Sequence, residues 1–182
     1  CTGAPDCGPL GDALASAEIY DPTMGTFGVT GAMSQARTLH SVERLADGRV
    51  IAIAGMNERR EGFTSTEIFD PSRGRWFPGP PLASEPRVFH ASALLPSGRV
   101  LVGGGKLPDT RFLATVNVID VEGESRVASP LSIALTMPRF LALPSGRTLS
   151  VGGFRCPRPC APVSDASLYD ETSDTWSTIG SL

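Results

Sequence analysis

The sequence predicts an all-β fold in which a four-stranded unit repeats about every fifty residues. One marker of the repeat is a glycine followed by arginine, which recurs at spacings of 50 and 48 residues at Gly48, Gly98 and Gly146. A second is an aspartate after a large side chain, at spacings of 49, 50 and 50 residues, at Asp21, Asp70, Asp120 and Asp170. No segment of useful length shows the 3.6-residue period of an amphipathic helix, so the repeating unit is built from strands.

The strands can be assigned within one unit. Residues 38–46 and 49–55 are β-prone, and Asp47-Gly48 between them is typical of a two-residue hairpin turn. Residues 63–71 form a third strand, and residues 73–81 hold a short fourth strand that proline restricts to a sheet edge. The same order fits residues 88–130 and 132–180, whereas residues 15–30 correspond to a third and a fourth strand only.

Large and small side chains mark the strand ends. The residue before the aspartate is Tyr20, Phe69 or Tyr169, and Trp76 and Trp176 follow six residues after two of the aspartates. We expect these aromatic side chains, including both tyrosines, to be buried between sheets. The third unit has Ile119 and Arg126 at these positions, so its outer edge is expected to pack poorly. The glycine pairs Gly103-Gly104 and Gly152-Gly153 are expected to allow close approach of neighbouring backbones.

This pattern resembles the kelch repeat of β-propellers, and the Leu-Pro-Ser-Gly-Arg spelling is most similar to bacterial kelch proteins and to the propeller of galactose-oxidase-like enzymes. The resemblance includes the pairs Arg37/His40 and Arg87/His90, and it extends from about residue 15 to residue 182. It implies that residues 1–182 form one kelch-type propeller segment. Its parts are a half blade with an N-terminal loop (1–36), a blade (37–86), a degenerate blade (87–134) and a further blade (135–182).

These parts add up to about three and a half blades, fewer than the resemblance implies for a closed ring. Each unit alone exposes apolar faces, and open strand edges invite further pairing. We therefore expect the ring to be completed by the rest of a longer polypeptide or by other chains.

Composition and motif searches exclude several classes of function. The formal net charge is -3, which gives no general attraction to nucleic acid or to anionic lipid. No stretch has the 18 apolar residues of a membrane-spanning helix, so no membrane insertion is expected. A phosphate-binding loop, a Gly-x-Ser-x-Gly nucleophile motif and a His-Glu-x-x-His metal motif are all missing from the sequence. We therefore name no catalytic residue, no metal ligand and no cofactor.

The four cysteines occur as two close pairs among proline and glycine, Cys1/Cys7 and Cys156/Cys160. Paired cysteines in loops are typical of an oxidising compartment, so we expect two disulfides that stiffen these loops. A metal site would need two more ligands for each pair, and free thiols are the remaining alternative. Disulfides predict an extracellular, cell-surface or periplasmic protein.

The candidate binding residues lie in the loops between second and third strands, at residues 56–64, 104–114 and 154–166. These loops are long and dissimilar, and variable loops on a repeated scaffold are a usual place for binding. They carry a small excess of positive charge, which is either solvated loop charge or a shallow site for an acidic or sugar ligand. The candidate ligand-binding side chains are Arg59, Arg60, Lys106, Arg111, Arg155 and Arg158.

His40 and His90 are the chain's two histidines, and both precede a Gly-Arg turn by eight residues. One hypothesis is a copper site, as the resemblance to galactose-oxidase-like enzymes would imply. The other is that histidine belongs to the repeat and packs between blades. No functional residue of such an enzyme can be assigned to a position here, because Tyr20 and Tyr169 occupy repeat positions.

The sequence thus favours a non-catalytic kelch-repeat module of a secreted or cell-surface protein that binds protein or glycan through these loops. Two alternatives stay open. The chain could be the propeller portion of a copper-radical oxidase, or a structural subunit that completes a propeller with other chains.

Overall fold

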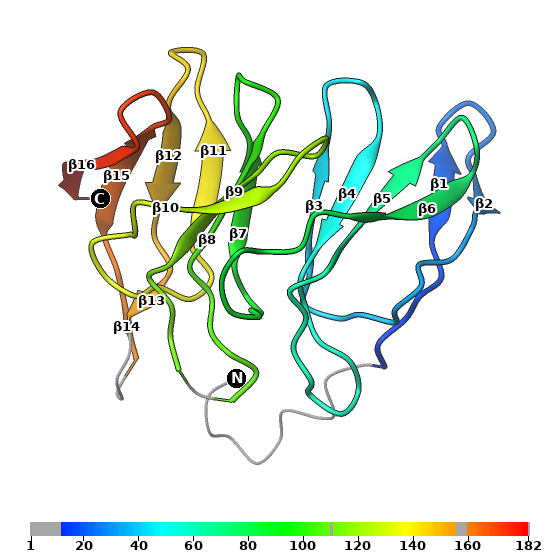
Figure 1. Cartoon of the computed structure of the whole chain (residues 1–182), viewed down its shortest axis with the longest axis horizontal. Helices are drawn as coiled ribbons and strands as arrows, with labels where there is room; N and C mark the ends of the chain where they lie inside the picture. The colour runs from blue at the N-terminus through cyan, green and yellow to red at the C-terminus, as the bar shows by residue number, and fades with distance from the viewer. Residues whose placement is uncertain (1–11, 110, 156–159, 182) are drawn as a thin grey trace.

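The computed structural model describes residues 12–109, 111–155 and 160–181, and all of its regular structure is β-strand. Sheets follow one another in chain order across the molecule, from β1 (Glu18–Asp21) and β2 (Thr26–Val29) at one end to β16 (Thr175–Ser181) at the other (Figure 1). The first strands of the three four-stranded sheets lie in a row, in which β7 (Ala91–Leu94) contacts both β3 (Ser41–Arg44) and β11 (Arg139–Ala142). The described part has no helix that could cross a membrane.

Three sheets have four antiparallel strands, as the repeat predicts. The first sheet has two strands, β1 (Glu18–Asp21) and β2 (Thr26–Val29). The second sheet is β3 (Ser41–Arg44), β4 (Val50–Ile53), β5 (Thr66–Asp70) and β6 (Arg75–Gly79). The third sheet is β7 (Ala91–Leu94), β8 (Val100–Gly103), β9 (Val116–Ile119) and β10 (Ser125–Ala128). The fourth sheet is β11 (Arg139–Ala142), β12 (Thr148–Val151), β15 (Asp165–Asp170) and β16 (Thr175–Ser181), with a short ribbon, β13 (Phe154–Arg155) and β14 (Ala161–Pro162), between β12 and β15.

The turn between the first two strands of a sheet has three residues, so the prediction of a two-residue turn at Asp47-Gly48 is wrong. Leu45 N–H donates to the Arg49 carbonyl at 2.8 Å, which leaves residues 46–48 as the loop. Gly48 has a φ of 91°, the left-handed conformation that ends a three-residue hairpin loop. The turns at Gly98 and Gly146 have the same bonds and a positive φ, so glycine is needed at each for its backbone.

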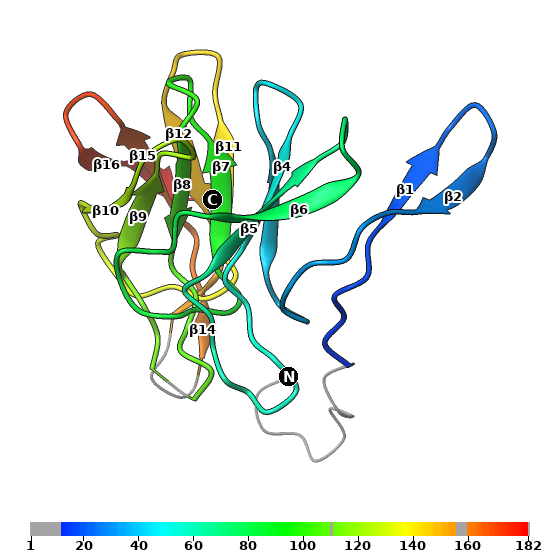
Figure 2. The ribbon, with the colours of Figure 1, turned by 45° about the vertical axis from the view of Figure 1, so that its right-hand side comes forward.

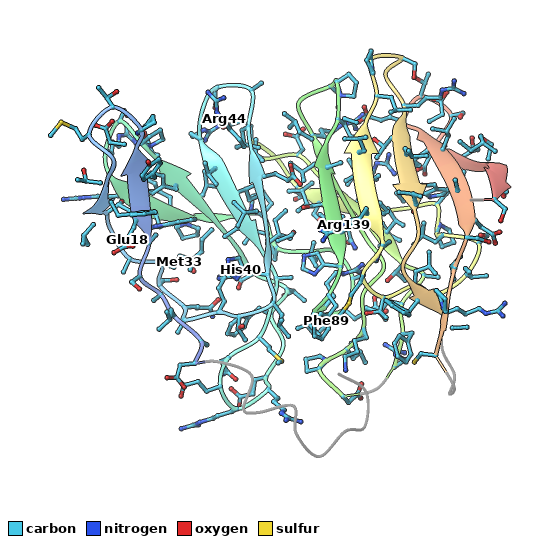
Figure 3. All side chains as sticks on the ribbon, turned by 180° about the vertical axis from the view of Figure 1, so that it is seen from behind. Glu18, Met33, His40, Arg44, Phe89 and Arg139 are labelled. Atoms are coloured by element: carbon cyan, nitrogen blue, oxygen red, sulfur yellow. The ribbon has the colours of Figure 1, made fainter. Side chains whose placement is uncertain are left out.

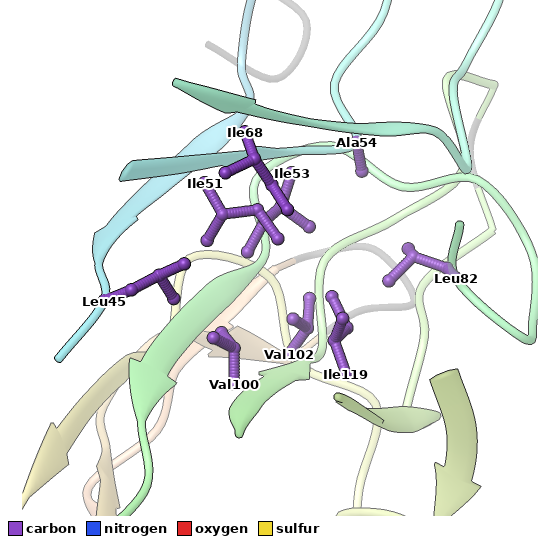
Figure 4. Packing of buried hydrophobic residues seen from close by; sticks show 9 residues of the cluster. All are labelled: Leu45, Ile51, Ile53, Ala54, Ile68, Leu82, Val100, Val102 and Ile119. Atoms are coloured by element: carbon purple, nitrogen blue, oxygen red, sulfur yellow. The ribbon is translucent and has the colours of Figure 1, made fainter. Parts of the chain in front are cut away.

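The core lies between the faces of successive sheets. Ile51, Ile53 and Ile68 of the second sheet pack against Val100, Val102 and Ile119 of the third (Figure 4). Five of these six side chains are almost completely inaccessible to solvent and Ile68 is nearly so. A strand covered on both faces uses apolar residues at successive positions, and this explains the apolar run Val50–Ile53.

The close approach predicted at Gly103-Gly104 extends one residue further, to Gly105. Gly104 and Gly105 have φ values of 67° and 86°, while Gly103 belongs to β8. A Cβ on Gly105 would lie 2.5 Å from the Val88 carbonyl oxygen, and its N–H donates to the Leu135 carbonyl at 2.7 Å. The second position of the pair therefore joins two sheets by backbone. At the first position a Cβ on Gly104 would lie 2.8 Å from the Leu135 carbonyl oxygen, which is the close approach predicted, although Ala54 occupies this position in the preceding unit with a φ of 56°.

The outer edge of the third unit, predicted from Ile119 and Arg126 to pack poorly, is partly covered. Ile119 is fully buried, and Arg126 Nη1 lies 3.3 Å from the Asp174 carboxylate of the next sheet. The same carboxylate accepts a hydrogen bond from the Tyr169 hydroxyl at 2.6 Å. Burial, and next this bond, raise the pKa of Tyr169 to about 12. Arg126, which stands where other units have tryptophan, is thus paired with Asp174, 48 residues later in the chain.

The aromatic residues of the repeat differ in burial. Trp176 packs on Tyr169 with ring centroids 5.1 Å apart, and Tyr169 is fully buried as predicted. Tyr20, with its ring partner Phe27, is 52% exposed, so the prediction that both tyrosines are buried is wrong for Tyr20. The reason is that no described sheet covers this face of β1 and β2.

Two arginines at the start of successive units are buried. Arg37 donates to the carbonyl of Ala54 at 2.8 Å and forms an ion pair with Glu67 at 2.8 Å, and both side chains are almost fully buried. Burial alone would raise the pKa of Glu67, but hydrogen bonds from Ser34 N–H and Arg37 hold it below its usual value. In the next unit Arg87 instead binds carbonyl and hydroxyl oxygens, and burial lowers its pKa to about 10.

Candidate functional site: the loop face

The loops between the second and third strands of the sheets lie together at one end of the molecule, and we call this end the loop face (Figure 1). Each loop begins as a continuation of its sheet, because Met56 pairs with Thr38 and Lys106 pairs with Val88. The loops of the second and third sheets touch, since a Cβ on Gly62 would lie 2.5 Å from the ring of Pro108. The loop face is therefore a supported surface.

The loop of the second sheet is organised by Asn57. Its side-chain oxygen accepts hydrogen bonds from the N–H groups of Arg59 and Glu61, each at 2.9 Å. Its amide donates to the Glu61 carboxylate at 2.6 Å. Arg60 takes a φ of 62° at the tip. This short turn presents the exposed side chains of Arg59 and Arg60, neither of which forms an ion pair with a described residue.

The two cations of the third sheet's loop have partners. Lys106 Nζ lies 5.7 Å from the centre of the Phe89 ring, and Figure 3 places Phe89 toward the loop face, before β7 begins. Arg111 lies 3.5 Å from the Glu85 carboxylate in a partly exposed ion pair. An exposed pair of this kind contributes little stability, so both cations can still face a ligand.

The third loop is described only in part. β13 and β14 form its stem, and Arg155 on β13 is exposed without an ion pair to any described residue. Cys160 is disulfide-bonded. Arg158, Cys1, Cys7 and Cys156 lie outside the described residues, so the pairing of the cysteines stays a prediction.

The two histidines lie at contacts between the inner strands. His90 Nε2 is 2.9 Å from the Ser41 hydroxyl of the second sheet. Burial lowers the pKa of His90 to about 3, and the nearby charge of Arg87 adds to this effect. Burial and the charge of Arg37 also lower the pKa of His40, which Figure 3 places at the end of the second sheet, directly before β3. Among residues 12–109, 111–155 and 160–181, no three His, Cys, Asp or Glu side chains are grouped as metal ligands.

Acid is expected to destabilise the protein through His90. The unfolded chain binds a proton at this residue below about pH 6.5, whereas the folded chain does so only near pH 3. The stabilisation present at pH 7 is therefore lost as the pH falls, by about 2 kcal/mol between pH 7 and 5. Urea unfolding at both pH values checks this, and His90→Asn should remove that part of the pH dependence. An unchanged pH dependence in the variant would contradict the assignment.

The sequence did not predict a pocket of about 660 Å³ between the first and second sheets. Apolar side chains dominate its lining, among them Ile19, Val42, Val50 and Phe69. The signal for it was the lack of a first and second strand in residues 15–30, which leaves part of the intersheet space unfilled.

No model of a known protein family matches this sequence. Alpha-scruin of Limulus polyphemus is 27% identical over 117 aligned residues, which cover 61% of this chain and 12% of alpha-scruin. The solved structure of YjhT superimposes with a TM-score of 0.78 at 12% identity, over 92% of this chain and 62% of that one. The chain thus spans less than two thirds of either protein, and it shares the fold of YjhT over most of its own length.

Proposed function

We propose that this chain is a kelch-type β-propeller segment that acts as a non-catalytic binding module. Alpha-scruin is a kelch-repeat protein, and this supports the repeat assignment made from the sequence. The proposed blades are residues 37–86, 87–134 and 135–182, with a half blade in residues 1–36. The proposal includes no cofactor, and it places the protein outside the cytoplasm because of its paired cysteines.

The binding site in this proposal is the loop face. The observation that carries it is the presentation of Arg59, Arg60 and Arg155 on hydrogen-bonded loops without ion-pair partners in the described part of the chain. Guanidinium groups bind carboxylate and sulfate oxygens through paired hydrogen bonds. The ligand is therefore an acidic surface on a protein or glycan.

Charge reversal tests this site. We expect the chain to bind immobilised heparin or a poly-glutamate peptide, and the triple variant R59E/R60E/R155E to bind at least about tenfold more weakly, as loss of several charge-assisted bonds implies. The matched control is R44E/R147E. Both control arginines are exposed and lie beside the turns at the opposite end, as Figure 3 shows for Arg44. Equal losses in the two variants would mean a general charge effect and would refute the loop face as the site.

A further inference from the structure

Strand β1 has one edge with which no described strand pairs. In the described chain it pairs with β2 alone, whereas its counterparts β5, β9 and β15 each pair with a strand on both sides. Figure 2 shows β1 and β2 standing apart from the second sheet at their turn end. An open strand edge presents unpaired N–H and C=O groups to any strand that can reach it.

The groups on this edge can be identified. Thr30 N–H donates to the Ala17 carbonyl, and Ile19 and Asp21 follow Ala17 at alternate positions toward the turn. Antiparallel pairing alternates, so these residues bond to β2. The backbone groups of Glu18 and Tyr20 therefore point to the free edge.

The pocket beside this edge lies between the first and second sheets. The corresponding space between the second and third sheets is filled by side chains. Between the second and third sheets, Ile51 and Ile53 of β4 pack against Val100 of β8. Val50 holds the position of Val100 one unit earlier, and it lines the pocket together with Ile19. What is missing there is a strand with branched apolar side chains at alternate positions.

The indole nitrogen of Trp76, in the same region, lacks the hydrogen bond that the equivalent tryptophan makes. Trp176 Nε1 donates to the Ser129 carbonyl of the preceding sheet at 3.0 Å. Trp76 holds the same repeat position and lines the pocket, yet its Nε1 is buried with no described acceptor. A buried N–H without a partner costs free energy, so the first and second sheets are not packed against each other as the third and fourth are.

We propose that the β1 edge and the adjoining pocket form a docking site for a β-hairpin of this chain's own repeat type, which pairs with β1 and fills the pocket with branched apolar side chains. The hairpins β3–β4, β7–β8 and β11–β12 are each already paired with a third strand, so a second copy has none to donate. The occupant is therefore a hairpin from another segment of polypeptide. The inference rests on the proposed repeat architecture but not on ligand binding at the loop face.

A synthetic peptide with the sequence of residues 38–55 is the probe. We expect it to bind the 182-residue chain one to one in calorimetry. Hydrogen exchange measured by NMR should slow at the amides of Glu18 and Tyr20, as new strand pairing requires. A peptide with serine in place of Ile51 and Ile53 should bind at least about tenfold more weakly, because apolar burial is lost.

Two variants of the chain localise the binding. Ile19→Asn lies in the pocket and should weaken binding about tenfold or more. Val29→Asn is the control, because Val29 lies on β2 away from the free edge and is 84% exposed. Equal affinity for both variants, or no slowing at Glu18 and Tyr20, would overturn the proposal. Protection of these amides without peptide in a dimer detected by light scattering would make a second copy the occupant, and would overturn it too. A loop-face variant that keeps peptide binding separates this result from the proposed function.

Discussion

Replacing Glu67 with alanine is expected to lower the free energy of unfolding by about 3–5 kcal/mol, the range for removal of one member of a buried ion pair. Arg37 would keep its charge in a site where its side chain has no exposure to solvent. The Ser34 N–H, which donates to the Glu67 carboxylate at 2.6 Å, would lose its acceptor as well. Arg37 would thus be left as a buried charge without its counter-ion, and this is more costly than the loss of an exposed contact.

Urea unfolding at pH 7 measures this effect. Glu58→Ala is the control, because Glu58 is an exposed loop residue and its removal should change stability by less than about 0.5 kcal/mol. Glu67→Gln should fall between the two, since an amide oxygen still accepts hydrogen bonds but carries no charge. A loss below about 1 kcal/mol for Glu67→Ala would show that solvent reaches Arg37 and that the pair is not a buried one.

Replacing Gly105 with alanine is expected to cost about 2–4 kcal/mol, from left-handed strain together with a lost hydrogen bond. At a φ of 86° the new Cβ would lie 2.5 Å from the Val88 carbonyl oxygen, which is backbone and cannot move aside cheaply. Relief of that clash would pull the Gly105 N–H away from the Leu135 carbonyl of the next sheet.

Gly98→Ala is a matched control for Gly105→Ala. Gly98 has nearly the same φ, 85°, but a Cβ there would have nothing within 4 Å. The free energy of unfolding of Gly98→Ala should therefore fall by about 1–2 kcal/mol, which is the cost of the left-handed backbone conformation alone. Thermal or urea unfolding of both variants measures the difference, which belongs to the close contact with Val88 and to the hydrogen bond to Leu135. Equal losses would mean that close approach at Gly105 has no energetic consequence.

The strands and their order in the chain could be predicted because the information is local. Apolar runs such as Val50–Ile53, the turn glycines and the proline in β6 each act on residues next to them. The loop cations could be named for the same reason, since the loops are what remains between strands. The three-residue turn was missed because Asp-Gly also occurs where the glycine follows a type I turn.

Contacts between sheets could not be predicted in this way. Arg126 alone indicated a poorly packed edge, and its partner Asp174 is 48 residues away at a position held by glycine in an earlier unit. Nothing in the sequence indicated a role for Glu67, because its contribution to stability depends on Arg37 being buried beside it. Residues that meet through packing leave no signal in local spacing.

The sequence by itself determined the all-β architecture, the fifty-residue repeat and the strand order, because hydrophobic alternation and turn chemistry act over a few neighbouring residues. Only the tertiary structure decided which repeat positions are buried. Tyr20 and Tyr169 occupy the same position in the repeat, yet one is half exposed and the other fully buried. The difference lies in the neighbour: the third sheet covers Tyr169, while no described sheet covers Tyr20. Burial is a property of the packed pair of sheets, and a single strand's sequence does not contain it.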